Sequence, residues 1–325
     1  MMRKGSRLAV LLSSALLFIC FAGTVHAQSY PTKLIRIVVP FPPGGATDVF
    51  ARMMAQPLSE NVRQQVIVEN RGGGNAVIGT EMVAKAAPDG YTLLFNAMGP
   101  IATPGLYKRL PFDVEKDFTP ITLAVTSPNM LAAHPSLPAN TIGELIALAK
   151  TKPGQLNGAI SFFGGSNHLT SELFMSQAGI KMETLAYKGA APALNDLLGG
   201  HANTMFNTIG SMAGHLKTGK LKALAVTTRN RIDTLPDVPS MSETLPGFET
   251  ASWFGIWGPG KMPKEVLARV SAEIVKVLHA PDLKKRYKEQ YAEAVGNSPE
   301  EFAVYEKAER EKWAKVIKNV GVVLD

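Results

Sequence analysis

Cysteine is almost absent from this sequence, because Cys20 is the only one among 325 residues. A disulfide framework is therefore excluded, and a chain of this length has to be stable through its hydrophobic core. A large excess of one charge is also missing, since Lys and Arg outnumber Asp and Glu by only 34 to 27. The cations are scattered apart from Lys284, Lys285 and Arg286, so we expect no nucleic-acid partner.

Catalytic and cofactor motifs are missing too. The richest glycine run, residues 72–74, is followed by neither a P-loop lysine nor the third glycine of a dinucleotide fingerprint. No Gly-x-Ser-x-Gly nucleophile motif occurs, and no two histidines lie four residues apart as in a helical zinc site. We therefore expect no catalytic residue, no cofactor and no metal. A hydrolase using Ser166 and His168 is the enzymatic alternative, although loop neighbours two residues apart rarely form a nucleophile–base pair.

The first 27 residues read as a secretory signal peptide. Three cations (Arg3, Lys4 and Arg7) precede the apolar run 8–22, and small residues flank a cleavage site after Ala27. Removing them leaves 298 residues with a net charge of +4 instead of +7. The alternatives are a membrane anchor, for which the run is short, and a lipoprotein modified at Cys20, which Ile19 disfavours. The sequence thus predicts an exported, periplasmic protein.

Beyond the signal peptide, apolar strand-like runs alternate with helical periodicity in two successive series, which indicates an α/β fold with parallel strands. The first series comprises strands 34–39, 65–70 and 91–96 and helices 48–60 and 77–87. The second comprises helices 144–150, 168–179 and 191–200 and strands 158–163, 182–187, 202–208 and 221–228. Helices 263–280 and 299–320 follow at the end.

Two extended segments, 118–136 and 247–260, join the two series. We interpret them as crossover hinge strands between two α/β lobes, which would rotate as a cleft closes. The expected division is residues 1–27 for the signal peptide, 28–126 and 251–325 for the first lobe, and 127–250 for the second lobe.

The corner "PFPPGGATD" after the first strand has more prolines and glycines than a turn needs. The first N–H groups of a helix have no internal partner and carry partial positive charge, so they bind anions. Glycine permits close approach and proline stiffens the loop. We expect Gly44 and Gly45 to present N–H groups, Thr47 or Asp48 to cap the helix, and Phe41 to form a pocket wall. The alternative interpretation is an ordinary tight turn.

A second corner, "SFFGGSNHL", follows a strand of the second series, with its helix running from His168. Ligands of open α/β sheets settle at such strand ends. Two facing corners would hold an anion between the lobes, and the strand ends at Asn96, Tyr187 with Lys188, and Asn207 would complete the site. The candidate ligand-binding residues are Phe41, Pro43, Gly44, Gly45, Ala46, Thr47, Asn96, Phe162, Phe163, Gly164, Gly165, Ser166, His168, Tyr187, Lys188 and Asn207.

A charged amino group is costly to bury without a carboxylate partner, and none of these corners offers such a carboxylate. Asn207 stands where an amino-acid pocket would be expected to present an acid. The sequence therefore favours a carboxylic acid without an amino group.

Several segments in order, among them "IRIVVPFPPGGATDVFAR", "VIVENRGGGNAVIGTEMVAKAAPDGYTLLF", "LPFDVEKDFTPIT", "YKGAAPALNDLLGG" and "SWFGIWGP", resemble the periplasmic receptors of tripartite tricarboxylate transporters, the Bug (TctC-like) proteins. The resemblance implies a class II periplasmic binding protein fold that closes on a small carboxylate. It also implies backbone amides and waters as ligands at residues 41–47 and 164–168, and delivery to the small and large subunits of a membrane permease.

The sequence departs from the family at two points. Phe162 and Gly165 stand where the second corner usually has glycine and a hydroxyl residue, and Phe206-Asn207 replaces a frequent Phe-Asp. Our hypothesis is that Phe41 with Phe162 or Phe163 sandwiches an aromatic or apolar mono- or dicarboxylate. We expect a monomeric receptor, with a ligand sensor for a membrane kinase as the alternative.

Overall fold

The computed structural model describes residues 30–99 and 104–320. The predicted signal peptide and its cleavage site at Ala27 lie outside these residues. Contacts within the chain divide it after Thr32, and the unit Lys33–Asp325 is the one considered below. Within the part of the chain that is described, no helix has both the length and the apolar character required to cross a membrane.

The first series of strands and helices forms as the sequence predicts. Strand β1 (Ile35–Val39) pairs in parallel with β2 (Val66–Asn70) on one side and β3 (Thr92–Ala97) on the other. Apart from the partly buried Arg36 its residues are apolar, because parallel strands are covered on both faces, and Val38 is fully buried. Helices α2 (Ala46–Val62) and α3 (Val77–Ala84) connect these strands. We refer to these elements, with α8 (Lys264–Leu278), α9 (Pro281–Glu289) and α10 (Pro299–Val320), as the first lobe.

The second series also forms. Strand β5 (Asn157–Ile160) lies between β6 (Glu183–Ala186) and β7 (Thr204–Thr208), again in parallel. The helices are α4 (Ile142–Thr151), α5 (Ser166–Ala178), α6 (Ala190–Leu198) and α7 (Ile209–Lys217). Helix α7 was not predicted, because it is short and two glycines interrupt its apolar pattern. We refer to these elements, with β8 (Lys222–Val226), as the second lobe.

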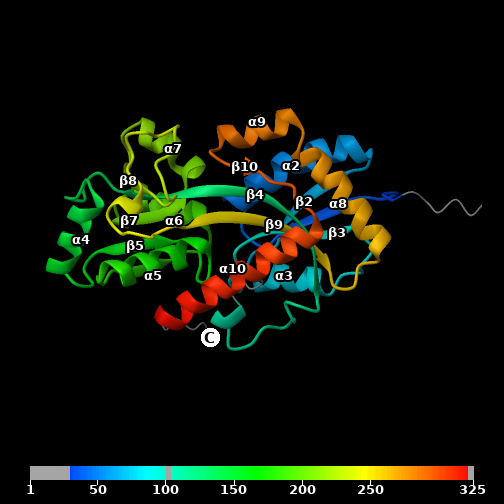
Figure 1. Ribbon diagram of the computed structural model, residues 1–325, viewed down its shortest axis with the longest axis horizontal. Coiled ribbons are helices and arrows are strands. Elements are labelled where there is room, and N and C mark those ends of the chain that lie inside the picture. The colour runs from blue at the N-terminus through cyan, green and yellow to red at the C-terminus, as the bar shows by residue number, and fades with distance from the viewer. Residues whose placement is uncertain (1–29, 100–103, 321–325) are drawn as a thin grey trace, which may run out of the picture. The chain divides into compact units, whose positions relative to one another are not determined.

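Two antiparallel strands connect the lobes, β4 (Phe118–Ala133) and β9 (Ala251–Pro259). Strand β4 pairs with β9 as far as Pro128 and then with β7 from Asn129 onward, so one strand belongs to both lobes. The resulting order is β2-β1-β3-β9-β4-β7-β5-β6, with β8 and β10 (Glu293–Ala294) also paired to β4. Figure 1 shows β4 and β9 running side by side between the two sets of strands. The fold is thus the two-lobed α/β fold that was expected.

The C-terminal helices hold β9 in place. Trp253 and Trp257 of β9 are buried, and their indole N–H groups donate to Glu309 (2.9 Å) and Glu306 (3.2 Å) of α10. Both predicted C-terminal helices are present as α8 and α10. Between them lies α9, which carries the basic cluster seen in the sequence.

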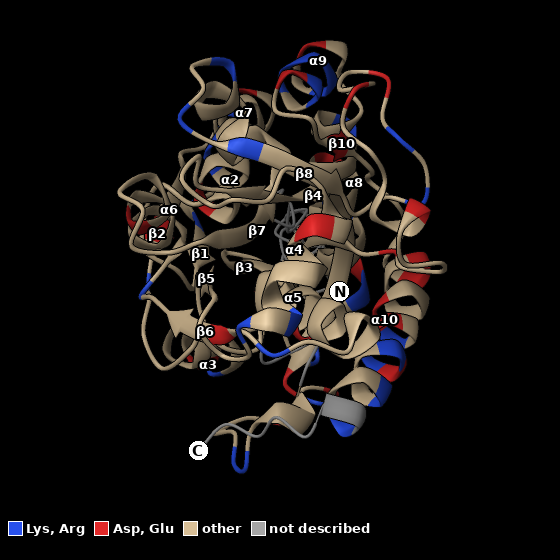
Figure 2. Ribbon diagram, turned by 90° about the vertical axis from the view of Figure 1, so that its left-hand side faces the viewer, with Lys and Arg blue, Asp and Glu red and all other residues tan. Residues whose placement is uncertain are grey.

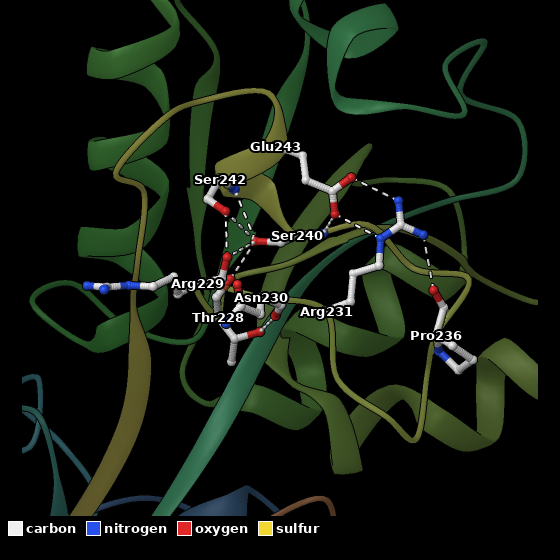
Figure 3. A network of polar contacts seen from close by, with 8 residues as sticks. All are labelled: Thr228, Arg229, Asn230, Arg231, Pro236, Ser240, Ser242 and Glu243. Atoms are coloured by element: carbon white, nitrogen blue, oxygen red, sulfur yellow. Dashed lines mark hydrogen bonds and ion pairs between the residues drawn. The ribbon is translucent and has the colours of Figure 1, made fainter.

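The segment that leads from β8 back to β9 is braced by the polar network of Figure 3. The Ser240 hydroxyl donates to the Thr228 carbonyl (2.5 Å) and accepts from the Ser242 N–H (3.2 Å). The Arg231 guanidinium donates twice to the Glu243 carboxylate, at 2.8 Å each, and lowers the pKa of Glu243 to about 2. This segment is therefore an ordered connection that delivers the chain to β9.

Candidate functional site

The two corners predicted from their prolines and glycines repeat one backbone conformation. Gly44 and Gly164 have φ angles of 90° and 79°, in the left-handed region where glycine is favoured. Gly45 and Gly165 follow in extended conformation (φ −84° and −81°) and are the N-cap residues of α2 and α5. Each corner therefore leads directly into the N-terminus of a helix, although the two sequences share only the Gly-Gly pair.

The first amide of each corner is already used within the protein. The Gly44 N–H donates to the Asp48 carboxylate (3.0 Å), and the Gly164 N–H donates to Nδ1 of His168 (3.1 Å). The expectation that Gly44 and Gly164 would offer these N–H groups to an anion is therefore wrong in this structure. Asp48 and His168 each lie four residues after the glycine whose N–H they accept, and these bonds fix the conformation of the corner.

The helix starts also differ from those expected. The N-cap of α2 is Gly45, so neither Thr47 nor Asp48 occupies that position, and α5 begins at Ser166 instead of His168. The amides left without intrahelical partners are thus those of the residues directly after each glycine pair. Glycine is required at position 165, because a Cβ there would lie 2.6 Å from the Phe162 ring.

The aromatic sandwich predicted from Phe41 and Phe162 is not formed. The two rings contact each other, with centroids 4.6 Å apart. A pair of aromatic rings in contact already spans about 4.5–7 Å, so no third ring fits between them. Phe163 instead contacts His168 and packs against the core of the first lobe. Phe41 and Phe162 therefore close one wall of a cavity across the interlobe cleft.

That cavity, here called the inner chamber, has a volume of about 60 Å³. It is lined by residues of both lobes and of β9, and no Asp, Glu, Lys, Arg or His is among the described residues that line it. The predicted residues that line it are Phe41, Gly45, Ala46, Thr47, Phe162, Gly165, Ser166 and Asn207. The others are Pro42, Ala97, Ser161, Asn167, Gly189, Ala190, Thr208, Ser252 and Phe254.

Four helix N-termini meet at the inner chamber. The N-cap residues of α2, α5, α6 and α7 are Gly45, Gly165, Gly189 and Thr208, and all four line it. None of these residues caps its helix with a side-chain hydrogen bond. Each N-terminus carries roughly half a positive charge from the helix dipole. The chamber is therefore electropositive without a single cationic side chain in its lining.

Polar side chains connect the two lobes at the back of the chamber. The Ser166 and Ser252 hydroxyls are 2.9 Å apart, and Ser252 donates to the Asn129 side-chain oxygen (2.9 Å). The Asn167 amide donates to Oδ1 of Asn207 (3.4 Å). Asn207 is only 3% exposed, yet its Nδ2 has no partner among the described residues. A buried donor without a partner is costly, so this amide is available to a ligand atom at the chamber.

Ser166 and His168 do not form a nucleophile–base pair. Nδ1 of His168 accepts the Gly164 N–H, and Nε2 lies 3.5 Å from Glu172. The Ser166 hydroxyl bonds instead to Ser252 and to Asn167 (3.3 Å). Such a pair requires a direct hydrogen bond, so the geometry gives no support to the hydrolase alternative.

The remaining predicted residues do not line the inner chamber. Tyr187 donates to Asp196 (2.6 Å), and burial, with this bond, raises the pKa of Tyr187 to about 12. Lys188 is exposed, whereas Asn96 is fully buried in β3. Pro43, Phe163, Gly164 and His168 also lie outside the lining, and Gly44 lines the neighbouring cavity described below.

The residues that sequence reasoning missed fall into two groups. Gly189, Ala190 and Thr208 lie at corners that the sequence did identify, and the helix starts would have revealed them. Ser252 and Phe254 lie near the start of β9 and reach the chamber only because that strand inserts between β3 and β4. The sequence around them carries no local signal of a binding site.

Charged residues concentrate away from the chamber. Strands β3, β5 and β7 contain none and are drawn tan in Figure 2, whereas α10 carries many of both signs. Across the described ranges, no group of three or more His, Cys, Asp or Glu residues is arranged to hold a metal ion. The chemistry available at the chamber is thus hydrogen bonding and helix-dipole electrostatics.

Comparison with known proteins identifies similar chains. The family model described as "Tripartite tricarboxylate transporter family receptor" matches residues 50–322. A structure of an R. palustris protein solved with adipate is 33% identical, covers 90% of this chain and 99% of its own, and has a TM-score of 0.87. The periplasmic binding protein BugD is 36% identical, with coverage of 90% and 99% and a TM-score of 0.85. MatC from Rhodopseudomonas palustris, with bound malate, is 28% identical, with coverage of 89% and 100% and a TM-score of 0.83.

Proposed function

Because the chain belongs to the receptor family of the tripartite tricarboxylate transporters, we propose that its inner chamber captures a small carboxylate lacking an amino group and that the protein delivers it to a membrane permease. The family consists of periplasmic solute-binding receptors, so the protein is a receptor and not an enzyme. The ligand and the delivery are our proposal.

The observation that carries the proposal is the convergence of four uncapped helix N-termini on one cavity whose described lining contains no charged side chain. Backbone amides at helix N-termini stabilise a carboxylate through hydrogen bonds and the helix dipole. Asn207 supplies a further donor that has no partner among the residues that the structure describes. An ammonium group would meet no carboxylate among the described lining residues, so amino acids are disfavoured.

The size of the inner chamber restricts the part of the ligand that it holds. One water needs about 10–15 Å³ of such volume, so a cavity of about 60 Å³ corresponds to about four to six water positions. That suits a carboxylate with a few aliphatic carbons against Phe41, Phe162 and Phe254. Within the inner chamber it favours an aliphatic body over an aromatic ring. The adipate and malate of the related structures are carboxylates of the proposed type.

The proposal includes a hinge between the lobes, with boundaries near residues 126/127 and 250/251. Its support is that β4 changes partner between Pro128 and Asn129 and that β9 begins at Ala251. We further propose cleavage of the signal peptide near Ala27, a monomeric receptor in the periplasm, and the small and large subunits of a permease as partners. A sensor that presents its closed form to a membrane kinase would use the same cleft.

A binding screen of the protein purified from the periplasm of an expression host tests this proposal. We expect succinate, malate or adipate to raise the melting temperature saturably, because a ligand at a hundredfold excess over Kd stabilises by about 2.7 kcal/mol. Aspartate and glutamate should give much smaller shifts, and NMR should show the acid unchanged after incubation. Binding of amino acids alone, or of no acid at all, would refute the function. Mass spectrometry of the N-terminus would check the cleavage site.

A further inference from the structure

A second cavity, here called the outer chamber, lies beside the inner one. Its volume is about 290 Å³, and it is lined by residues of α2, α6 and α7 and by Gln290 at the end of α9. Four residues line both chambers, namely Ala46, Ala190, Asn207 and Thr208. We call these four residues the neck. The two cavities are therefore contiguous across the cleft between the lobes.

The neck consists mainly of small side chains and contains one polar group without a described partner. Two of its four residues are alanines, and Ala190 faces the first corner closely enough that a Cβ on Gly45 would lie 3.6 Å from its own. Asn207 is the other notable member, because its Nδ2 is buried and has no partner in the described structure. A ligand passing through the neck would place a polar atom within reach of that amide while its methylene groups contact the alanines.

The lining of the outer chamber also indicates what would occupy it. Val49, Phe50 and Leu194 provide apolar contacts, and no ionisable side chain is found among its described lining residues. Gly210 and Ser211 belong to the first turn of α7, whose N-cap makes no side-chain capping bond. An aliphatic chain with a second anionic end fits this combination, because the chain meets apolar walls and the anion meets unpaired amides.

We propose that the outer chamber is the second half of the ligand site and that it receives the distal end of a linear aliphatic dicarboxylate, which passes through the neck from the inner chamber. This inference rests on the proposed function and adds chain length as the property that the receptor selects. Acids too short to pass the neck depend on the inner chamber alone. Longer diacids use both chambers and bind more tightly.

Substitutions at the neck and in the outer chamber separate the two halves of the site. In Ala190→Leu the larger side chain obstructs the neck, and Leu194→Trp fills the outer chamber without changing a neck residue. The control is Ala147→Leu on the exposed face of α4, which makes the same change in size away from both chambers. Isothermal titration with malonate, succinate, adipate and suberate measures Kd for each protein.

We expect the wild type and Ala147→Leu to bind adipate and suberate more tightly than malonate. Both site variants should weaken binding of the longer acids by about tenfold or more. Leu194→Trp changes no residue of the inner chamber and should alter Kd for malonate by less than about threefold, whereas Ala190→Leu also narrows the inner chamber and should weaken malonate too. An equal loss for every acid in Leu194→Trp, or no loss for any acid in either variant, would overturn the role of the outer chamber and leave the proposed function standing. Failure of the wild type to bind any of these acids would refute the proposed function itself.

Discussion

At the scale of single residues, the described lining of the candidate site consists of groups that carry no formal charge. Asp48, the acid closest to the first corner, is turned back onto the Gly44 N–H and the Arg52 side chain (2.9 Å). Asn207 contributes an oxygen that is satisfied by Asn167 and by the Thr208 N–H (2.9 Å), which leaves its Nδ2 for a ligand. The proposed preference for anions therefore depends on Asn207 remaining an amide.

Asn207→Asp tests this dependence with an almost isosteric change. The new carboxylate would repel the carboxylate of the ligand and remove the free donor, so we expect Kd for adipate to rise by at least about tenfold. Asn230→Asp is the matched control, since Asn230 is exposed and lines neither chamber. Isothermal titration compares the two variants. Equal affinity for adipate in Asn207→Asp and the wild type would exclude Asn207 as a ligand-binding residue.

At the scale of elements, the parallel strands, most helices and the two glycine corners were predictable because each has a local pattern. The apolar runs predicted β1, β5 and β7 and the C-terminal ends of β1 and β7, whereas β5 ends at Ile160 and not at Phe163. Local patterns did not predict the partner of the Gly44 amide. The Asp48 side chain reaches back to Gly44 only because α2 begins at Ala46, and the sequence did not reveal that start. Nor did local patterns place Ser252 and Phe254 at the chamber, since only the insertion of β9 between β3 and β4 brings them there.

The connection from β8 to β9 offers a comparison of a buried and an exposed contact. Ser240 is 2% exposed and begins the capping box of the 3₁₀ helix Met241–Glu243, so Ser240→Ala should cost about 1–2 kcal/mol of unfolding free energy. Arg231→Ala removes an exposed ion pair with Glu243, and such pairs contribute about 0–1 kcal/mol. Urea unfolding measures both free energies. If Arg231→Ala lowered the unfolding free energy as much as Ser240→Ala, the buried Ser240 cap would not be the more stabilising of the two contacts.

At the scale of the whole Lys33–Asp325 unit, the lobes contact each other at several glycines. Pro42 lies against Gly189, where a Cβ would come within 3.3 Å of its ring, and Gly210 of α7 lies against the backbone of Gln290 at the end of α9. A Cβ on Gly210 would lie only 2.4 Å from the Gln290 carbonyl oxygen, which belongs to rigid backbone. Each of these contacts joins one lobe to the other, so we expect them to depend on how far the cleft closes.

Gly210→Ala should therefore impair closure of the cleft and leave the separate lobes intact. Alanine favours a helix over glycine by about 0.5–1 kcal/mol, so the ligand-free protein should be no less stable. Overpacking of a close contact typically costs about 1–3 kcal/mol, which predicts a Kd for adipate raised by about tenfold or more. Gly214→Ala on the same helix is the control, because a Cβ there meets nothing within 4 Å. Isothermal titration measures the affinity for adipate, and small-angle scattering with and without adipate measures closure of the cleft. The same affinity and the same degree of closure in both variants would show that Gly210 does not contact Gln290 in the ligand-bound state.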